Sequence, residues 1–190
     1  MCYTLILLEN ICYNFGMNGN CHFMFSATVT GMVVLNLEKV NMILPNIPMD
    51  SEMGALLIMG GLIGGVFPDI DNPKSHFGQL CKPISSVIGE IGKLFGKTGS
   101  HHRGIFHDFS VYLAGLILSY FFAPFLVGFF LGALSHLFLD MFNPAGIPAL
   151  FGVRQIHLGK ISADSTGAIV LTYMFISLFL ATGIILKFAL

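Results

Sequence analysis

The sequence predicts an all-α, integral-membrane helical bundle of about five short spans, with a metal site at one membrane face. Three observations lead to this expectation. Of the 190 residues, 55% are hydrophobic and only 10% are charged, whereas soluble domains average nearer a quarter charged. The hydrophobic residues form five separate stretches. Histidines and aspartates gather at the ends of those stretches, where ionisable groups beside apolar segments are costly and point to function.

The apolar stretches fall at about 23–37, 53–67, 109–122, 125–142 and 166–188. Several are shorter than the ~20 residues that a helix needs to cross a ~30 Å hydrocarbon core. Local thinning of the bilayer or burial inside a bundle accommodates short spans. We expect residues 17–190 to form a single membrane-embedded domain. Residues 1–16 are expected to be a dispensable extension, because Met17 is a plausible start.

Residues 109–142 are compatible with one long helix or with two helices that reverse near Ala123 and Pro124. Proline lacks the amide donor and clashes with the preceding turn, so a break is plausible. A continuous helix would separate His107 from Asp140 by roughly 50 Å at 1.5 Å per residue. A reversal brings both to one face, and we prefer it because it gathers the polar residues.

With this reversal, the polar ends of all five spans meet on one side. Most basic residues lie in the two loops of that side, and only Lys39 and Lys187 lie opposite. Excess Lys and Arg marks cytoplasmic loops, so we expect a multi-pass protein of the cell membrane whose site faces the cytoplasm. In the first loop, Ile84 to Phe95 has helical apolar spacing. That stretch is expected to lie on the membrane surface or over the site, with an ordinary surface helix equally plausible. The basic residues of the two loops are Lys74, Lys82, Lys93, Lys97, Arg103, Arg154 and Lys160.

His136 and Asp140 are four residues apart, which places both side chains on one face of a helix. That spacing suits two ligands of one metal ion, although a buried imidazole–carboxylate hydrogen bond gives the same pattern. Asp69 and Asp71 follow Pro68 in an extended turn, where alternate side chains point to opposite sides. One of the two is therefore expected to ligate, and capping aspartates are the simpler alternative. The nearby glycines are expected to allow close helix packing.

His102 and His107 flank Arg103 and Gly104, ahead of the third span. His107 would then lie in the first helical turn and point into the cluster. Arg103 offers a fork of donors suited to phosphate or carboxylate, and a lipid headgroup contact or a salt bridge to Asp108 is equally plausible.

Imidazoles with carboxylates suit Zn²⁺, Mn²⁺ or Fe²⁺ better than Ca²⁺. Five or six candidate ligands exceed the set of one catalytic zinc, which keeps a position open for water. We therefore expect two divalent ions, with Zn²⁺ preferred, bridged by a carboxylate as in two-metal phosphoester hydrolysis. The candidate metal ligands are His22, Asp69, His102, His107, His136 and Asp140.

Four ordered motifs make the chain resemble the bacterial and archaeal family of predicted inner-membrane metal-dependent hydrolases (YdjM-like). They are C-H at 21–22, F-P-D-I-D-N-P-K-S at 67–75, H-R-G-I-F-H-D at 102–108, and S-H-L-F-L-D-M-F-N-P-A-G-I-P at 135–148. The resemblance covers nearly all of residues 20–165. It implies a class of chemistry rather than a substrate.

A more distant similarity connects the chain to zinc-dependent bacterial phospholipase C, which gathers histidines and aspartates in a comparable order. That similarity implies five ligands, with Asp140 bridging two ions. The chain lacks a further histidine-rich set for a third ion. The implied ligands are His22, Asp69, His107, His136 and Asp140.

We therefore expect a membrane-bound metal-dependent hydrolase that acts on a phosphoester of a lipid or lipid-linked substrate. Asp71 or Asp108 would accept a proton, and Arg103 would hold the phosphate. The alternative is a metal-binding membrane protein without turnover, such as a transporter or a scaffold. Membrane lipids are the expected partners. A net charge of −1 and the absence of a basic stripe give no case for nucleic acid. The four cysteines suggest neither a zinc ribbon nor a disulfide framework.

Overall fold

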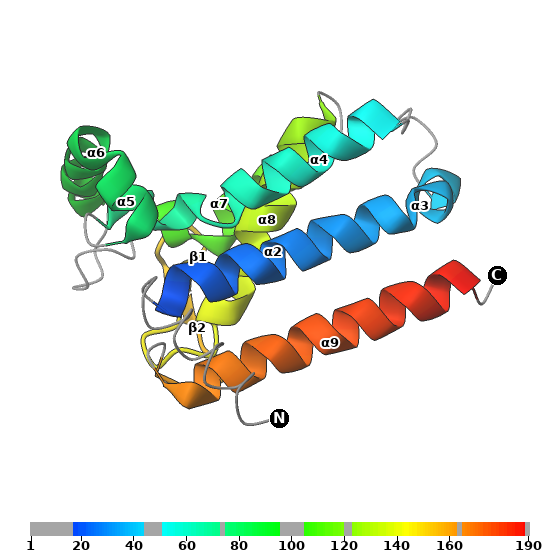
Figure 1. The fold of residues 1–190 in the computed structure, drawn as a ribbon. Coiled ribbons are helices and arrows are strands. Elements are labelled where there is room, and N and C mark those ends of the chain that lie inside the picture. Colours follow the sequence, from blue (N-terminus) through cyan, green and yellow to red (C-terminus); the bar gives the residue numbers. More distant parts are fainter. Residues whose placement is uncertain are drawn as a thin grey trace.

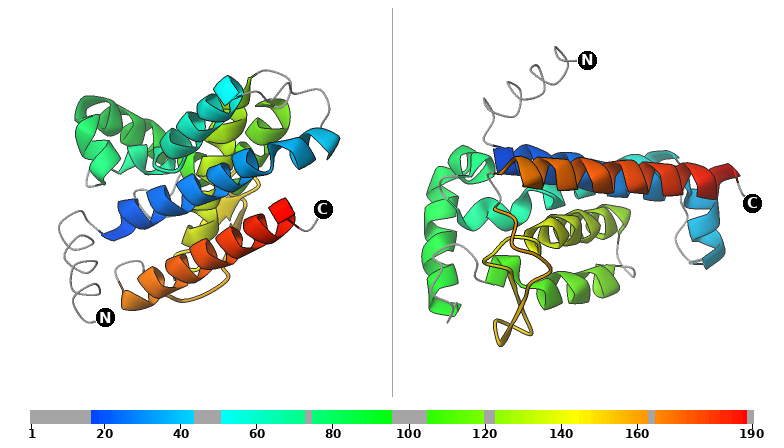
Figure 2. Two further views of the ribbon diagram at one scale, coloured as in Figure 1. Left: turned by 45° about the vertical axis from the view of Figure 1, so that its right-hand side comes forward. Right: turned by 90° about the horizontal axis from the view of Figure 1, so that it is seen from below.

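The structure is a computed structural model that describes residues 17–43, 51–72, 75–95, 105–119, 123–162 and 165–188. Its longer helices lie lengthwise beside one another, and α6 lies across one end of the bundle (Figures 1 and 2). The elements are α2 (Met17–Leu35), α3 (Leu37–Ile43), α4 (Ser51–Gly64), the 3-10 helix η1 (Phe67–Asp71), α5 (His76–Leu80), α6 (Lys82–Phe95), the 3-10 helix η2 (Ile105–His107), α7 (Phe109–Ser119), α8 (Pro124–Asp140), β1 (Ile147–Ala149), β2 (Arg154–Ile156) and α9 (Thr166–Phe188).

Each of the five predicted apolar stretches coincides with a helix, which confirms a mainly helical bundle. Two segments are long and apolar enough to cross a membrane, namely Glu52–Asp71 and Thr166–Phe188. The apolar helices Gly19–Leu35, Phe109–Ser119 and Pro124–Asp140 are shorter. At 1.5 Å per residue, the 11 residues of α7 extend only about 16 Å, roughly half of a hydrocarbon core. The number of crossings therefore stays a prediction.

The chain reverses at Pro124, as the sequence predicts. Helix α7 ends at Ser119, and α8 begins with Pro124 and packs against α7. Ala123 is extended, with φ −160° and ψ 141°. A residue that precedes proline is driven out of the helical region, so the break follows from local sterics. The two helices form a hairpin that returns the end of α8 to the start of α7.

Glycines on α4 and α8 let the two backbones touch. A Cβ on Gly64 would lie 1.9 Å from the carbonyl oxygen of Phe129, and one on Gly132 would lie 2.1 Å from that of Gly61. Gly60 and Gly128 have backbone neighbours at similarly short distances. Small residues spaced four apart permit this approach in membrane helices. The prediction that these glycines serve helix packing is confirmed.

Glycines at and just after the end of α4 also make room for α2, but here they meet side chains rather than backbone. Gly61 faces Thr30, and Gly65 faces Ser26. The hydroxyls of Ser26 and Ser135 are 2.6 Å apart, which joins α2 to α8. A hydrogen bond within a tightly packed interior satisfies the two buried hydroxyls that would otherwise be costly. Helices α2, α4 and α8 thus form one rigid core.

A short antiparallel hairpin, β1–β2, departs from the all-helical expectation. Its register pairs Ile147 with Ile156 and Ala149 with Arg154. Ile147 is fully buried in a cluster with Tyr112 and Leu137, which anchors the hairpin to α7 and α8. Three residues per strand are too few to leave a clear alternating pattern in the sequence.

The predicted amphipathic stretch forms α6, and two of its apolar side chains are exposed rather than packed on the protein. Ser85 is fully buried, and α6 contacts η1. Ile84 and Val87, on another side of the helix, are 56% and 60% exposed. This arrangement is typical of a helix at a membrane surface, which stays a prediction.

We expect Gly128→Ala to lower the thermal stability of the protein in detergent. The new Cβ would lie 2.0 Å from the carbonyl oxygen of Leu57, and neither backbone has a flexible side chain that yields. Overpacking of this kind costs about 1–3 kcal/mol. The measurement is the unfolding temperature.

Gly31→Ala is the matched control, because a Cβ at Gly31 has nothing within 4 Å. Alanine is the better helix former, so this variant should unfold at an equal or higher temperature. Equal unfolding temperatures for the two variants would contradict the close contact between α4 and α8.

Candidate metal centre

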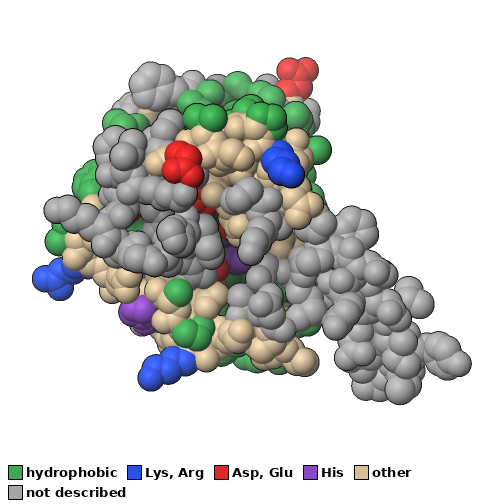
Figure 3. All heavy atoms as spheres, turned by 90° about the vertical axis from the view of Figure 1, so that its left-hand side faces the viewer, with side chains coloured by type: hydrophobic (Ala, Val, Ile, Leu, Met, Phe, Trp, Pro, Cys, Tyr) green, Lys and Arg blue, Asp and Glu red, His purple; other side chains and the backbone are tan. Residues whose placement is uncertain are grey.

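Five predicted ligands meet at one end of the bundle. Three of them are histidines that are at least nine-tenths buried, and side-chain exposure is 9% for Asp140 and 20% for Asp69. Seen end-on, acidic and histidine atoms are visible near the centre of this face (Figure 3). The ligands are His22 on α2, Asp69 in η1, His107 at the end of η2, and His136 and Asp140 on α8.

Four of the candidate ligand atoms lie in a ring, in which each atom is within 3.8 Å of two others. Nε2 of His107 lies 3.6 Å from Oδ1 of Asp69 and 3.7 Å from Oδ2 of Asp140. Nε2 of His136 lies 3.8 Å from each of the same two oxygens. Ligand atoms about 2.0–2.2 Å from a tetrahedral ion are roughly 3.3–3.6 Å apart, and these four separations are only slightly longer.

The carboxylate of Asp140 faces histidines with both oxygens. Oδ2 faces His107 and His136, and Oδ1 lies 3.6 Å from Nε2 of His22. The rings of His22 and His136 are stacked, with centroids 3.8 Å apart. Two overlapping groups of potential ligands result, one with His22, His136 and Asp140 and the other with Asp69, His107 and His136. Asp140 is placed as a bridging carboxylate would be.

His136 presents the nitrogen that a metal would use. Its Nδ1 lies 2.8 Å from the carbonyl oxygen of Gly65. A carbonyl only accepts, so Nδ1 carries the hydrogen and Nε2 keeps its lone pair. Nε2 has no hydrogen-bond partner among the described residues although it is buried. An orphaned nitrogen of this kind is costly unless something binds it.

Asp71 lies on the Nδ1 side of the His107 ring, whereas Asp69 lies on the Nε2 side. Oδ2 of Asp71 is 3.9 Å from Nδ1 of His107, and the residue is only 3% exposed. Carboxylates commonly orient metal-binding histidines from this position. Burial lowers the pKa of His107, while the nearby carboxylates of Asp69 and Asp140 act in the opposite direction. The neutral imidazole, which is the form that binds metals, is thereby favoured.

The turn that carries the two aspartates is helical, not extended as expected. Residues Phe67–Asp71 form a 3-10 helix with Pro68 near its start, where a missing amide hydrogen costs nothing. Asp69 and Asp71 lie beside the two different ring nitrogens of one residue, His107. The hydroxyl of Ser75 donates to the carbonyl oxygen of Asp69 and accepts from the amide of Gly78. These two hydrogen bonds of Ser75 hold the turn in place, and no spacing pattern in the sequence marks them.

Asp108 has backbone partners instead of the proton-accepting position expected for it. Its Oδ1 accepts the amide of Ser110 at 2.9 Å, and Oδ2 accepts the amide of Gly152 at 2.7 Å. The bonds indicate that Asp108 links the start of α7 to the β1–β2 turn. His102 and Arg103 lie outside the described residues.

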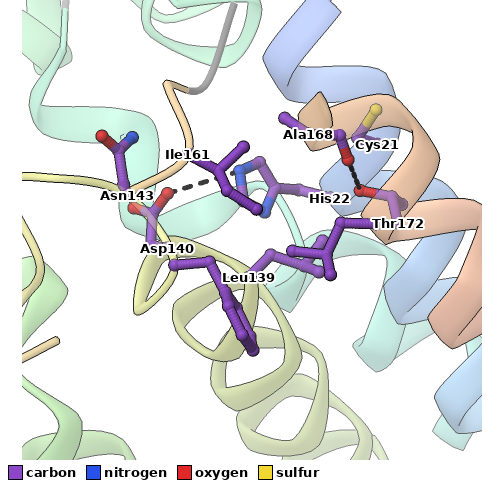
Figure 4. Close-up of a pocket in the computed structure, with 10 residues that line it drawn as sticks. Cys21, His22, Leu139, Asp140, Asn143, Ile161, Ala168 and Thr172 are labelled. Atoms are coloured by element: carbon purple, nitrogen blue, oxygen red, sulfur yellow. Dashed lines mark hydrogen bonds and ion pairs between the residues drawn. The ribbon is translucent and has the colours of Figure 1, made fainter. Parts of the chain in front are cut away.

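Two cavities reach the cluster from different sides of α2. One of about 110 Å³ is bordered by Asp69, His22 and His136 together with Phe23, Val66 and Phe77. A smaller one of about 30 Å³ lies between α2, α8 and α9. Figure 4 shows the smaller cavity, with His22 and Asp140 directed toward each other and Cys21, Asn143 and Thr172 around them. Cys21 and Asn143 lie in the sequence motifs at 21–22 and 135–148, whereas Thr172 lies outside the motifs.

Comparison with known proteins places the chain among membrane proteins. Residues 17–189 match the family described as YdjM inner membrane protein. The inner membrane proteins YdjM of Escherichia coli (strain K12) and Shigella flexneri are each 36% identical over 106 residues. That match covers 52% of this chain and 50% of each relative, so it spans about half their length. No solved structure matches. Because the family match extends over nearly the whole chain, this protein belongs to the YdjM inner membrane protein family.

Proposed function

We propose that the protein is a metal-dependent hydrolase of the membrane that holds divalent ions between His22, Asp69, His107, His136 and Asp140. One observation carries the proposal: three buried imidazoles and two carboxylates converge from α2, η1, η2 and α8. Burial of so many ionisable groups is expensive unless they are paired or bind a metal. The orphaned Nε2 of His136 fits the second case.

Two ions fit the donor set better than one. Five ligands exceed the three that a catalytic zinc ion normally takes from protein. The two oxygens of Asp140 face different histidines, which supports a carboxylate bridge. The mixture of imidazole and carboxylate favours Zn²⁺, with Mn²⁺ and Fe²⁺ as alternatives.

Bound divalent ions would supply a Lewis acid and an activated water for phosphoester hydrolysis. The chain contributes the positions of the ligands: the carbonyl of Gly65 fixes the ring of His136, and the carboxylate of Asp71, 3.9 Å from Nδ1 of His107, would orient that ring around a bound ion. We assign Asp71 this orienting role in preference to that of proton acceptor. His102 as a further ligand and Arg103 as a phosphate clamp remain part of the proposal.

A lipid or lipid-linked phosphoester is the substrate that the larger cavity favours. Phe23, Val66 and Phe77 border this cavity beside three of the ligands. An amphiphilic molecule could place its phosphate at the ligands and its apolar part along these side chains. Binding without turnover, as in a transporter, is less well supported, because a transport path would need polar groups midway along the helices. In the described parts of the five apolar helices, charged residues lie near the ends instead. The hydroxyls of Ser26 and Thr30 lie further in, and both are hydrogen-bonded within the protein.

We expect the purified protein to contain divalent metal, and Asp140→Asn to lose most of it. The amide keeps the shape of the side chain but lacks the charge that a bridge between two cations requires. Elemental analysis after gel filtration measures the content. Glu90→Gln, an exposed acid-to-amide change at the same end, should retain the metal. A full metal complement in Asp140→Asn would reduce Asp140 to a structural hydrogen-bond partner.

We expect hydrolysis of a phosphoester that bears an acyl chain, and faster turnover than for the same phosphoester without the chain. Asp140→Asn should abolish this activity. Asp71→Asn should lower it about 10–100-fold, because an orienting residue acts through the ligand it supports. Turnover that is independent of added metal and unchanged in both variants would rule out the hydrolase.

The site is proposed to face the cytoplasm, because the loops at its end of the bundle carry most of the Lys and Arg residues. A single cysteine at Ser162, in a background without the four native cysteines, should resist an impermeant thiol reagent in intact cells. Glu38→Cys at the opposite end should react. Labelling of Ser162→Cys from outside would reverse this orientation.

A further inference from the structure

The turn between β1 and β2 presents an apolar surface to its surroundings. Leu150, Phe151 and Val153 are 53%, 72% and 78% exposed. They flank Gly152 in a turn of four residues that closes the hairpin. Three neighbouring large side chains without cover are an unfavourable arrangement in water.

The backbone of this turn is also strained. Leu150 has φ 53° and Phe151 has φ 56°, both in the left-handed region that side chains with a Cβ disfavour. Asparagine or glycine is the usual choice at such positions, yet the chain places two bulky apolar residues there. The cost of exposure and the cost of strain therefore fall on the same residues, which suggests a function for the turn.

Two side chains at the start of α7 hold the turn in this conformation. The hydroxyl of Ser110 accepts the amide hydrogen of Leu150 at 2.8 Å. The carboxylate of Asp108, which is only 1% exposed, accepts that of Gly152 at 2.7 Å. A buried charge is thus used to preform an exposed apolar turn. The turn needs no further ordering before it meets a partner.

The position of the hairpin indicates which partner. Figure 2 (right) shows it at the same end as α6, projecting to the side of the bundle beyond α7 and level with the start of α9. Helix α9 is the longest membrane-capable helix, so its start marks the approximate level of the bilayer surface. Arg154 follows the turn and is exposed, as cations that contact lipid phosphates are. At the same end, α6 exposes Ile84 and Val87.

We propose that the turn Leu150–Val153 inserts into the interfacial region of the bilayer beside the site, and that Asp108 and Ser110 preform it for this purpose. Aromatic and aliphatic side chains gain free energy at this depth, while the neighbouring base stays among the headgroups. Insertion fixes the height of the site relative to the lipid surface. The inference depends on the membrane location of the family and is independent of the proposed hydrolysis.

The chain has no tryptophan, so a single substitution creates a specific reporter. Phe151→Trp in the full protein, reconstituted in phosphatidylcholine vesicles, should be quenched strongly by brominated acyl chains and weakly by aqueous acrylamide. Gln155→Trp, on the exposed side of the same hairpin, should show the reverse ranking. Val153→Trp tests the same surface independently and should show the same quenching pattern as Phe151→Trp.

Acrylamide quenching of both turn reporters at the level of Gln155→Trp would overturn insertion. The turn reporters could instead be shielded from both acrylamide and brominated lipid, and lose this shielding when the protein is diluted with excess lipid. That result would identify a second copy of the chain as the partner of the turn and would also overturn insertion.

Ser110→Ala in the Phe151→Trp protein tests the preformed turn, since it removes the acceptor for the amide of Leu150. We expect weaker quenching by brominated lipid and stronger quenching by acrylamide. Unchanged quenching would contradict the part of the proposal that concerns Ser110.

Discussion

The backbone contact between α4 and α8 is the constraint on which the rest of the structure depends. Gly64 and Gly132 lie in this contact, and the ligands follow within a few residues: Asp69 after α4, His136 and Asp140 at the end of α8. A carbonyl at the end of the contact, that of Gly65, fixes the ring of His136. Because backbones in direct contact cannot slide without clashes, the depth of Asp69 relative to His136 is set by helix packing rather than by the loops.

The cluster of three histidines and two aspartates concentrates ionisable groups in a protein of which only 10% of the residues are charged. Its members support one another: Asp71 lies behind His107, His22 stacks on His136, and Asp140 faces all three histidines. Burying so many imidazoles and carboxylates together in surroundings of low polarity is costly. A cluster of this cost is more easily understood as a binding site than as a means of stabilising the fold. Ligands supplied by four elements also make its integrity depend on the whole bundle.

The end of the bundle that carries the cluster also carries two features with exposed apolar side chains. Helix α6 lies across it with apolar side chains exposed, and the β1–β2 hairpin projects beside it. Asp108 shows how the two features are connected. It follows His107 directly, yet it binds the hairpin turn, so one short segment places both a ligand and an apolar surface. Such a link would keep the site at a constant height relative to the headgroups.

The sequence by itself determined the helical segments, the break at Pro124, the packing role of the glycines and the identity of the clustered residues. Each of these follows from a local property: apolar length, the missing amide of proline, the absence of a Cβ, or spacing along a helix. Only the tertiary structure decided that Asp71 lies behind His107, that Asp108 binds Gly152, and that residues 147–156 form a hairpin. These depend on partners 36 to 44 positions away or on strands of three residues, which leave no periodic signal in the sequence.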